Sequence, residues 1–316
     1  MRRCYHRLAH EPARMNILFT SQIEPPERWL PLLELALPQD RLFTDFRDGI
    51  DIALVAQPPP GTLAKLGGAK LIQSLWMGVE KLLADPALPR AVPLSRLVDP
   101  GMVAAMSETV LAHVLDWHRR LYRYRQQQEE ERWHRFRQYL ASDHTIGILG
   151  LGELGTDAAR KLLALGFKVA GWSRRAKSVE GVECFTDLAD VLERSNVVVC
   201  LLPLTEKTRG VLNEKTFSLL PKGAGVINLA RGPHVVVPDL IAALDSEQLA
   251  HAYLDVFDTE PLPEGSPLWR HPGVTVTPHA AALTEPRTAV ARIAANVERV
   301  RRGERPLNLV DFEAGY

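Results

Sequence analysis

The sequence has little cysteine, no long apolar run and no excess of charge of either sign. Its 316 residues include 3 cysteines, Cys4, Cys184 and Cys200, whose spacing matches no metal-ligand pattern. Lysine and arginine number 38, as do aspartate and glutamate, so no overall field favours nucleic acid or an anionic membrane. No stretch approaches the roughly 18 consecutive apolar residues of a membrane span. We therefore expect a cytoplasmic protein without a metal site.

The N-terminal segment 1–14 is too charged to contain the apolar core of a signal peptide. The first strand-like run begins only after it, at Asn16, and the segment receives no functional role here. The remaining length is sufficient for two hydrophobic cores, and two domains are the default expectation.

The most informative stretch is Thr145 to Gly155, which reads Thr-Ile-Gly-Ile-Leu-Gly-Leu-Gly-Glu-Leu-Gly. An apolar run typical of a buried strand breaks into Gly150, Gly152 and Gly155, and a helical pattern follows. Spaced glycines of this kind permit a tight turn, let the backbone approach a pyrophosphate and allow close helix packing. The pattern favours a dinucleotide site over a purely structural turn. Its candidate residues are Gly150, Gly152, Glu153, Leu154 and Gly155.

Short apolar runs alternate with helix-like or proline-rich segments along the rest of the chain. This alternation predicts an α/β fold with parallel sheets. The runs are 16–20, 52–56, 70–73, 93–97, 167–172, 196–202, 225–229, 252–255 and 274–277. A closing helix is expected from the spacing of Val290, Ile293, Val297 and Val300.

A long helix is expected from Gly101 to about Arg125, followed by a polar stretch from Arg123 to Arg135. A charged stretch of this kind is typical of a solvated helix face. Aromatic residues within and beside it favour the alternative, an interface between domains or subunits. They are Tyr122, Tyr124, Trp133, Phe136 and Tyr139.

Charged or titratable residues follow three consecutive strands, and they are Arg231, Glu260 and His279. The carboxyl ends of parallel strands meet at one edge of a sheet, where the side chains that follow them converge. Histidine can give a proton near neutral pH, a paired carboxylate orients its ring, and arginine matches a carboxylate. Together they suit the reduction of a 2-oxo acid, although each alone also has an ordinary structural explanation.

An NAD-binding unit usually carries an acidic residue about 20 positions after its glycines. Here that region reads Trp172-Ser173-Arg174-Arg175, without a carboxylate. Arginines can grip the 2′-phosphate of NADP with charge-assisted hydrogen bonds. NADP is therefore the expected cofactor, and the alternative is a basic surface turn.

Taken together, these motifs resemble the D-2-hydroxyacid dehydrogenase family, and the resemblance covers most of the chain. The motifs that carry it are Ile227-Asn-Leu-Ala-Arg-Gly232, Leu254-Asp-Val-Phe-Asp-Thr-Glu-Pro-Leu262 and Thr277-Pro-His279, downstream of the glycine loop. Other segments are similar to the NADPH-dependent glyoxylate/hydroxypyruvate reductase A branch of that family. They are Gln73-Ser-Leu-Trp-Met-Gly78, Cys200-Leu-Leu-Pro203, Trp172-Ser-Arg174 and Ser266-Pro-Leu-Trp-Arg-His-Pro272.

The resemblance implies a role for each matching residue. Arg231 would bind the substrate's carboxylate and carbonyl, His279 would be the acid/base and Glu260 its partner. Trp76, Met77 and Gly78 match the substrate loop, although from composition alone Trp76 could equally be a packed side chain. The remaining cofactor candidates are Trp172, Ser173, Arg174, Arg175, Leu202, Pro203, Thr208, Leu229, Ala230 and Asp255. The chain departs from the family pattern at Glu80 and in the run 280–282, which leaves substrate shape open.

The expected architecture is two doubly wound domains, Rossmann-like or flavodoxin-like, with the chain crossing twice between them. Residues 1–104 with 287–316 would bind substrate, and residues 105–286 would form the NADP-binding domain. The expected activity is NADPH-dependent reduction of glyoxylate or hydroxypyruvate in a homodimer. The alternatives are an NADH-preferring dehydrogenase of a bulkier 2-oxo acid and a nucleotide-sensing, corepressor-like binding protein.

Overall fold

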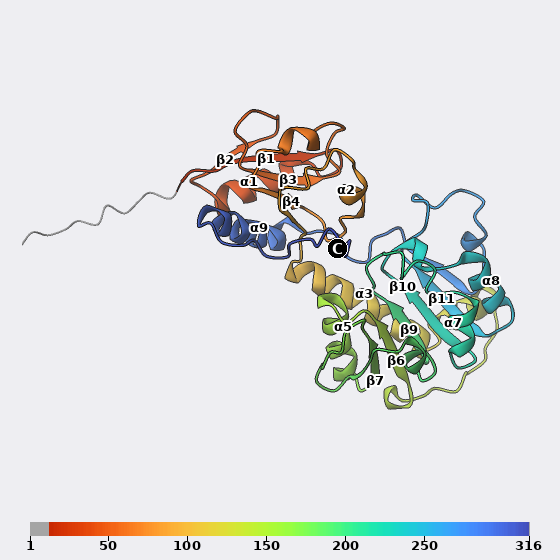
Figure 1. Cartoon of the computed structure of the whole chain (residues 1–316). Helices are drawn as coiled ribbons and strands as arrows, with labels where there is room; N and C mark the ends of the chain where they lie inside the picture. Colours follow the sequence, from red (N-terminus) through yellow and green to blue (C-terminus); the bar gives the residue numbers. More distant parts are fainter. Residues whose placement is uncertain (1–12, 316) are drawn as a thin grey trace, which may run out of the picture. The chain divides into compact units, whose positions relative to one another are not determined.

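The computed structural model describes residues 13–315, which divide into two compact units (Figure 1). Of the described residues, those up to Gly101 and from Thr284 onward form unit 1, and Met102 to Leu283 form unit 2. Cys4 and most of the segment 1–14 lie outside the described residues.

Unit 1 is a parallel sheet in the order β2-β1-β3-β4-β5, which is the flavodoxin-like order. The strands are β1 (Asn16–Ser21), β2 (Arg41–Phe43), β3 (Ile52–Ala56), β4 (Leu71–Ser74) and β5 (Leu94–Ser95). The helices are α1 (Pro26–Ala36), α2 (Glu80–Ala84) and α9 (Pro286–Arg301), with the 3₁₀ turn η1 (Leu63–Leu66). Apolar residues of α1 and α9, among them Trp29 and Ile293, share one core cluster with β1 and β3. Helix α9 thus lies in the same unit as the N-terminal strands.

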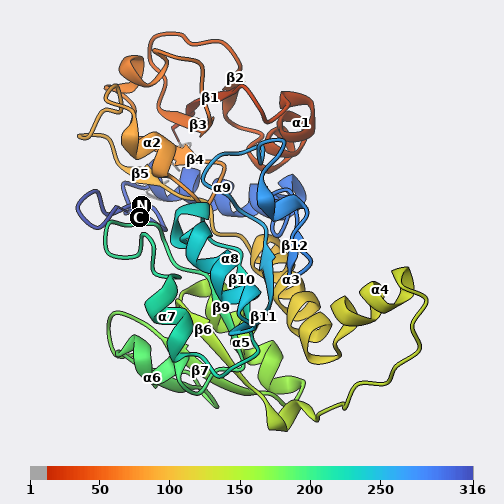
Figure 2. The ribbon, with the colours of Figure 1, turned by 90° about the vertical axis from the view of Figure 1, so that its right-hand side faces the viewer.

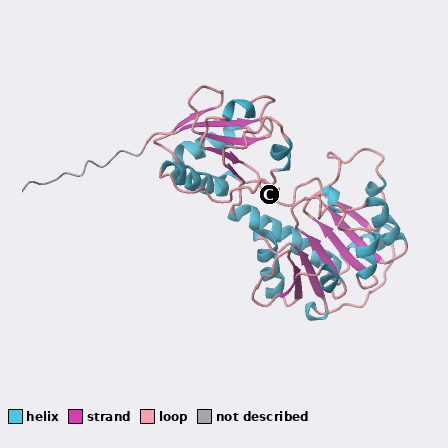
Figure 3. Ribbon diagram, in the orientation of Figure 1, coloured by secondary structure: helices cyan, strands magenta, loops and turns pink. Residues whose placement is uncertain are grey.

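Unit 2 is a seven-stranded parallel sheet in the order β12-β11-β10-β9-β6-β7-β8 (Figure 3). The strands are β6 (Thr145–Leu149), β7 (Lys168–Trp172), β8 (Glu183–Phe185), β9 (Val197–Cys200), β10 (Ala224–Asn228), β11 (Leu249–Leu254) and β12 (Val274–Val276). The order reverses at β6, which pairs with β7 on one side and β9 on the other. The predicted α/β class with two parallel doubly wound sheets is confirmed.

Six α-helices belong to the described part of unit 2. They are α3 (Pro100–His118), α4 (Leu121–Glu129), α5 (Glu153–Ala164), α6 (Leu188–Leu192), α7 (Glu214–Leu219) and α8 (Val237–Asp245). The 3₁₀ turns are η2 (Ala141–Asp143), η3 (Gly232–His234) and η4 (Pro267–Trp269). None of the helices that the structure describes is both long and apolar enough to traverse a membrane. Nor do three or more acidic, histidine or cysteine side chains of residues 13–315 gather in a way that could hold a metal ion.

The expectation of one helix from Gly101 to about Arg125 was wrong. The helix ends at His118, and Arg120 adopts a left-handed backbone with φ of +58° before α4 begins. An i to i−4 hydrogen-bond ladder cannot continue through such a residue. Beyond α4 the chain runs without regular secondary structure to Leu140. Tyr122 at the start of α4 is buried against His251 of β11, with ring centroids 4.4 Å apart, and Figure 2 shows the far end of α4 and the following segment extending away from the sheet of unit 2.

Buried histidines join helix α3 to the sheet of unit 2. The Nδ1 atoms of His118 and His144 lie 2.9 Å apart, and both side chains are buried. On strand β11, His251 is buried as well, and its Nε2 lies 2.8 Å from the hydroxyl of Thr275. Burial lowers the pKa of His144 to about 4, assisted by the neighbouring His118, and burial likewise lowers the pKa of His251 to about 4. These rings are neutral in the folded protein.

These low pKa values predict a loss of stability in acid. Between the unfolded value of 6.5 and about 4, the unfolded chain binds protons that the folded chain excludes, so stability is complete above pH 6.5 and falls as the pH drops. At pH 5, His144 and His251 are each expected to lower the free energy of unfolding by about 2 kcal/mol relative to pH 7.5. Urea unfolding of the wild type and of His144→Gln at both pH values measures the difference.

The His144→Gln variant should show the smaller pH dependence, by about the contribution of one ring. The exposed His134 provides a control, because His134→Gln should keep the wild-type pH dependence. An identical pH dependence of His144→Gln and wild type would contradict the assignment.

Candidate active site

The glycine loop lies at the point where the strand order of unit 2 reverses. Gly150 follows β6 with φ of +105°, and a Cβ there would lie 2.9 Å from the carbonyl oxygen of Leu201. A Cβ on Gly155 would lie 2.0 Å from the carbonyl oxygen of Gly150, so helix α5 can approach the strand only because residue 155 is glycine. A Cβ on Gly152 would meet nothing within 4 Å, so this part of the loop is open.

The first turn of α5 offers hydrogen-bond donors beside the open loop. Within the described residues, the backbone N–H groups of Gly152, Glu153 and Leu154 have no acceptor, as is usual at the start of a helix. Such groups, together with the helix dipole, favour an anion such as a pyrophosphate. The loop therefore fits the phosphates of a dinucleotide.

The end of β7 carries the residues expected to choose between NAD and NADP. Ser173 donates from its hydroxyl to the carbonyl oxygen of Arg175 at 2.7 Å, which closes a tight turn. Both Arg174 and Arg175 are exposed on this turn. The indole of Trp172 donates to the carbonyl oxygen of Thr186 at 3.0 Å. The turn is thus held by its own hydrogen bonds and presents its cationic side chains to solvent.

Sequence reasoning missed Lys177 in this region. Its ammonium group donates to the carbonyl oxygen of Leu151, inside the glycine loop. A lysine five residues beyond the strand end gives no recognisable signal in the sequence, because its contact depends on how the turn folds back. It adds a third cation to the arginine turn.

The loops after β9 and β10 lie at the same edge of the sheet as the glycine loop. Thr208 donates from its hydroxyl to the carbonyl oxygen of Pro203 at 2.7 Å, which ties the expected cofactor-side loop to its own start. Leu202 is buried, as are Leu229 and Ala230. Because β6, β9 and β10 are neighbours in a parallel sheet, these loops lie on the side that the glycine loop occupies.

The structure brings His279 and Glu260 together. Nδ1 of His279 lies 2.7 Å from Oε2 of Glu260, while the other carboxylate oxygen accepts from the backbone N–H of Phe257 at 2.9 Å. The side chain of His279 is 51% exposed, and among the described residues its Nε2 has no hydrogen-bond partner. One ring nitrogen is thus held by a carboxylate and the other is available.

The backbone around His279 is held by a buried carboxylate. Asp255, which is 1% exposed, accepts hydrogen bonds from the hydroxyl of Thr277 at 2.6 Å and from the N–H groups of Ala280 and Ala281 at 2.9 and 3.0 Å. His279 itself adopts a left-handed backbone with φ of +52°, and its N–H donates to the carbonyl oxygen of Asp255 at 2.8 Å. Asp255 therefore fixes the turn that presents the histidine.

Arg231 follows β10, the strand next to β11, and is half-buried. Its Nη1 donates to the carbonyl oxygen of Ala230 at 2.6 Å. The adjoining Gly232 is pressed against the loop of Glu260, because a Cβ at Gly232 would lie 1.9 Å from the carbonyl carbon of Phe257. The loops that carry Arg231 and Glu260 are therefore in direct backbone contact.

Unit 1 contains the loop expected to bind substrate. Trp76, Met77 and Gly78 follow β4, and all three are partly exposed. In the described part of the chain, the backbone N–H groups of Met77 and Gly78 donate to no acceptor. Two adjacent donors of this kind suit a carboxylate.

The family model for D-isomer specific 2-hydroxyacid dehydrogenases, NAD binding domain, matches residues 111–281. The chain is 43% identical over 314 residues to glyoxylate/hydroxypyruvate reductase A of Serratia proteamaculans, across 96% of this chain and all of the relative. The chain belongs to the D-isomer specific 2-hydroxyacid dehydrogenases.

Solved structures of this family share the fold over nearly the whole chain. A 2-hydroxyacid dehydrogenase from Xanthobacter autotrophicus in complex with NADPH and MES has a TM-score of 0.92 at 41% identity, covering 96% of this chain and 100% of the other. An NADPH-dependent glyoxylate/hydroxypyruvate reductase from Sinorhizobium meliloti in complex with NADP and sulfate has a TM-score of 0.89 at 36% identity, with the same coverage.

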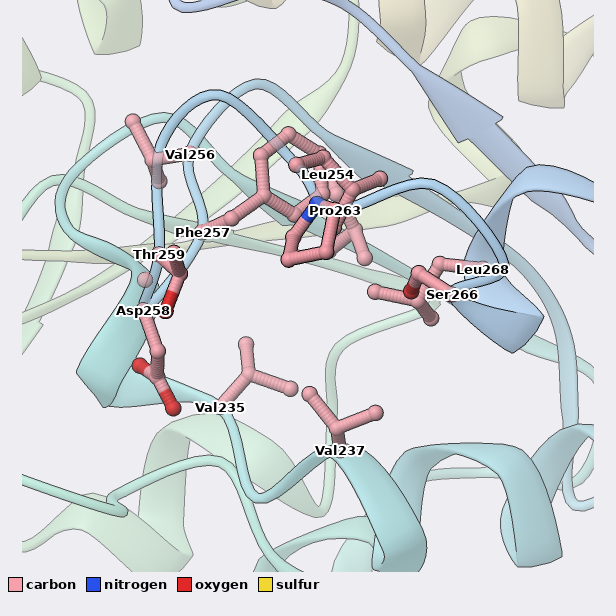
Figure 4. A pocket seen from close by; sticks show the side chains of 12 residues that line it. Val235, Val237, Leu254, Val256, Phe257, Asp258, Thr259, Pro263, Ser266 and Leu268 are labelled. Carbon is pink, nitrogen blue, oxygen red and sulfur yellow. The ribbon is translucent and has the colours of Figure 1, made fainter.

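This 2-hydroxyacid dehydrogenase has a cavity of about 160 Å³ behind the loop that carries Glu260. Figure 4 shows Val235 and Val237 on one side of it and Phe257 and Pro263 on the other. Its lining is mostly apolar and includes Gly232. Part of the Glu260 loop, from Phe257 to Thr259, faces the cavity, and the backbone of Phe257 also contacts Gly232, so we expect that contact to help support the loop.

Gly232→Ala tests this support. The new Cβ would overlap the backbone at Phe257 and Asp258, so the loop must move, and overpacking of this kind costs about 1–3 kcal/mol of unfolding free energy. Urea unfolding measures the loss. Gly273→Ala is a matched control in the same unit, because its nearest neighbours are side-chain atoms at 3.2 Å that can adjust. Equal losses in the two variants would refute the proposed contact.

Proposed function

We propose that this chain reduces small 2-oxo acids with NADPH, converting glyoxylate to glycolate and hydroxypyruvate to D-glycerate. The observation that carries the proposal is the 2.7 Å contact between His279 and Glu260, next to the strand whose end bears Arg231. The names of the Serratia relative and of the Sinorhizobium structure, which holds NADP, support the same substrates and cofactor.

His279 is the proposed proton donor. Its Nδ1 is engaged by Glu260, which fixes the orientation of the imidazole ring. Nε2 then carries the proton that passes to the alkoxide oxygen as the carbonyl is reduced. Glu260 is itself oriented by the N–H of Phe257, so the pair is ordered before substrate arrives.

Arg231 is the proposed ligand of the substrate's carboxylate, and it also polarises the carbonyl. Its guanidinium forms a planar set of donors that matches a carboxylate. In unit 1, the N–H groups of Met77 and Gly78, beside Trp76, are proposed substrate ligands. A small 2-oxo acid presents a carboxylate and a carbonyl on adjacent carbons, so the same contacts bind it and orient it.

The residues of the glycine loop fit NADPH, which supplies the hydride when bound. The open backbone at Gly152 and the free N–H groups of α5 are proposed to hold its phosphates. Arg174 and Arg175, with Lys177, are proposed to hold the 2′-phosphate. The other proposed cofactor contacts are Gly150, Leu154, Gly155, Trp172, Ser173, Leu202, Pro203, Thr208, Leu229, Ala230 and Asp255.

Unit 1 is the proposed substrate-binding domain and unit 2 the proposed NADP-binding domain. A homodimer is part of the proposal, because Trp133 and Leu140, in and near the polar stretch after α4, are 91% and 71% exposed. Apolar side chains so exposed on a projecting segment are typical of an interface. Cys184 and Cys200 are free, which suits the cytoplasm.

The central activity test is the reduction of glyoxylate, monitored through the decrease in NADPH absorbance. His279→Ala should lower kcat by about 10²–10⁴-fold, because proton transfer is lost, while the Kd for NADPH stays near the wild-type value. Arg231→Ala should raise KM, because the carboxylate contact is lost, and should lower kcat, because the carbonyl is no longer polarised. Turnover by His279→Ala close to wild type would remove the assigned role, and wild-type NADPH binding without turnover would favour a nucleotide-sensing protein.

Cofactor choice is tested with the double variant Arg174→Ala/Arg175→Ala. In this variant kcat/KM with NADPH should fall at least about tenfold, because one charge-assisted contact is worth about that factor. The kcat/KM with NADH should stay at the wild-type value. Arg160→Ala removes a cation from the exposed face of α5 and should leave the ratio of these two values unchanged. A wild type that prefers NADH would establish the alternative, an NADH-dependent dehydrogenase.

A further inference from the structure

The carboxylate of Glu24 joins two tryptophans of unit 1. Glu24 lies in the loop between β1 and α1, and its side chain is half-buried. One carboxylate oxygen accepts from the indole N–H of Trp76 at 3.0 Å, and the other accepts from the indole N–H of Trp29 at 3.1 Å. The backbone N–H of Glu24 donates to the hydroxyl of Ser21 at 2.7 Å, which fixes the loop.

Trp29 anchors this arrangement. Its side chain is 0% exposed and packs against Phe19, with ring centroids 6.2 Å apart. Trp76 is partly exposed and begins the loop whose N–H groups are proposed to bind substrate. Glu24 therefore connects a fully buried core residue to a residue of the candidate substrate loop.

The backbone of Trp76 is already fully engaged. Its N–H donates to the hydroxyl of Ser74 at 3.1 Å, and its carbonyl oxygen accepts from the same hydroxyl at 2.9 Å and from the N–H of Leu97 at 3.0 Å. What these bonds leave undetermined is the rotation of the indole ring. The bond to Glu24 is the polar contact that fixes it.

A carboxylate is a costly choice for a purely structural contact. Partial burial of its charge carries a desolvation penalty that a neutral acceptor would avoid. In return, hydrogen bonds to an ionised acceptor are roughly twice as strong as neutral ones. Such strength is useful where a side chain next to a ligand must be held in one rotamer before the ligand binds.

We propose that Glu24 is a positioning residue for substrate binding, acting through Trp76. It holds the indole in one orientation and so keeps the Met77 and Gly78 donors ordered for the carboxylate of the 2-oxo acid. This inference rests on the proposed function. Without Glu24, the cost of ordering the loop is added to each binding event, which raises KM and leaves the chemical step unaffected.

Steady-state kinetics with glyoxylate and NADPH test the proposal. Glu24→Ala should raise the KM for glyoxylate about tenfold, with kcat and the Kd for NADPH near wild type. Glu24→Gln should show a smaller rise, because its amide has one oxygen acceptor and cannot serve both indoles equally. The exposed Glu27, on the first turn of α1, provides the matched control, and Glu27→Ala should keep the wild-type KM.

A double-mutant cycle tests whether the effect passes through Trp76. Trp76→Phe keeps an aromatic ring and removes the indole donor, so it should raise KM, and adding Glu24→Ala should raise it little further. If the rise in KM of the double variant equals the product of the rises in the two single variants, the proposal is overturned. An unchanged KM in Glu24→Ala would overturn it as well. A fall in kcat with unchanged KM would also overturn it.

A second measurement does not depend on turnover. In the wild type the Trp76 indole ¹H–¹⁵N resonance, assigned with Trp76→Phe, should exchange slowly with solvent, and in Glu24→Ala its exchange should accelerate about tenfold or more. Equal exchange in both proteins would overturn the inference even if glyoxylate is reduced. A wild type that reduces no 2-oxo acid would instead refute the proposed function and with it the inferred role of Glu24 in substrate binding.

Discussion

The candidate active site depends most on the hydrogen bonds that the carboxylate of Asp255 accepts. This carboxylate is buried at the end of β11 and accepts hydrogen bonds from Thr277, Ala280 and Ala281, all in the turn after β12. Loss of that carboxylate would leave buried N–H donors without acceptors and release a turn in which His279 adopts a left-handed backbone. A buried charge is tolerated here because its donors surround it, and the same donors belong to the residues that present the histidine.

The parallel sheet determines where everything else meets. Strands β10, β11 and β12 are consecutive neighbours, so the loops that carry Arg231, Glu260 and His279 lie along one edge. Gly232 permits backbone contact between the first two loops, and the bond from His279 to Glu260 joins the second to the third. Unit 1 uses the same principle in its own sheet, where the loops after β1 and β4 meet through Glu24 and Trp76.

Local patterns in the sequence were sufficient for the fold class and the principal strands, because burial and periodicity are local properties. They failed where the signal was short or the contact distant. Strands β2 and β8 each begin with a charged, exposed residue and contain no apolar run, so they went unrecognised. Nothing in the sequence around Arg120 indicated its left-handed backbone. The bond between Glu24 and Trp76 joins residues 52 positions apart, and only the folded sheet brings them together. Roles for Arg231, Glu260 and His279 came from motif resemblance, and they stay predictions until variants are measured.

Transfer of deuterium tests the central claim most directly. The protein would be incubated with glyoxylate and with NADPH that carries deuterium at C4 of the nicotinamide, on one face in one sample and on the other face in a second. The deuterium content of the glycolate formed would be measured by mass spectrometry. A reductase that holds cofactor and substrate in one fixed arrangement should give glycolate with one deuterium from one labelled cofactor and none from the other. Absence of glycolate, or glycolate without deuterium from either cofactor, would contradict the account.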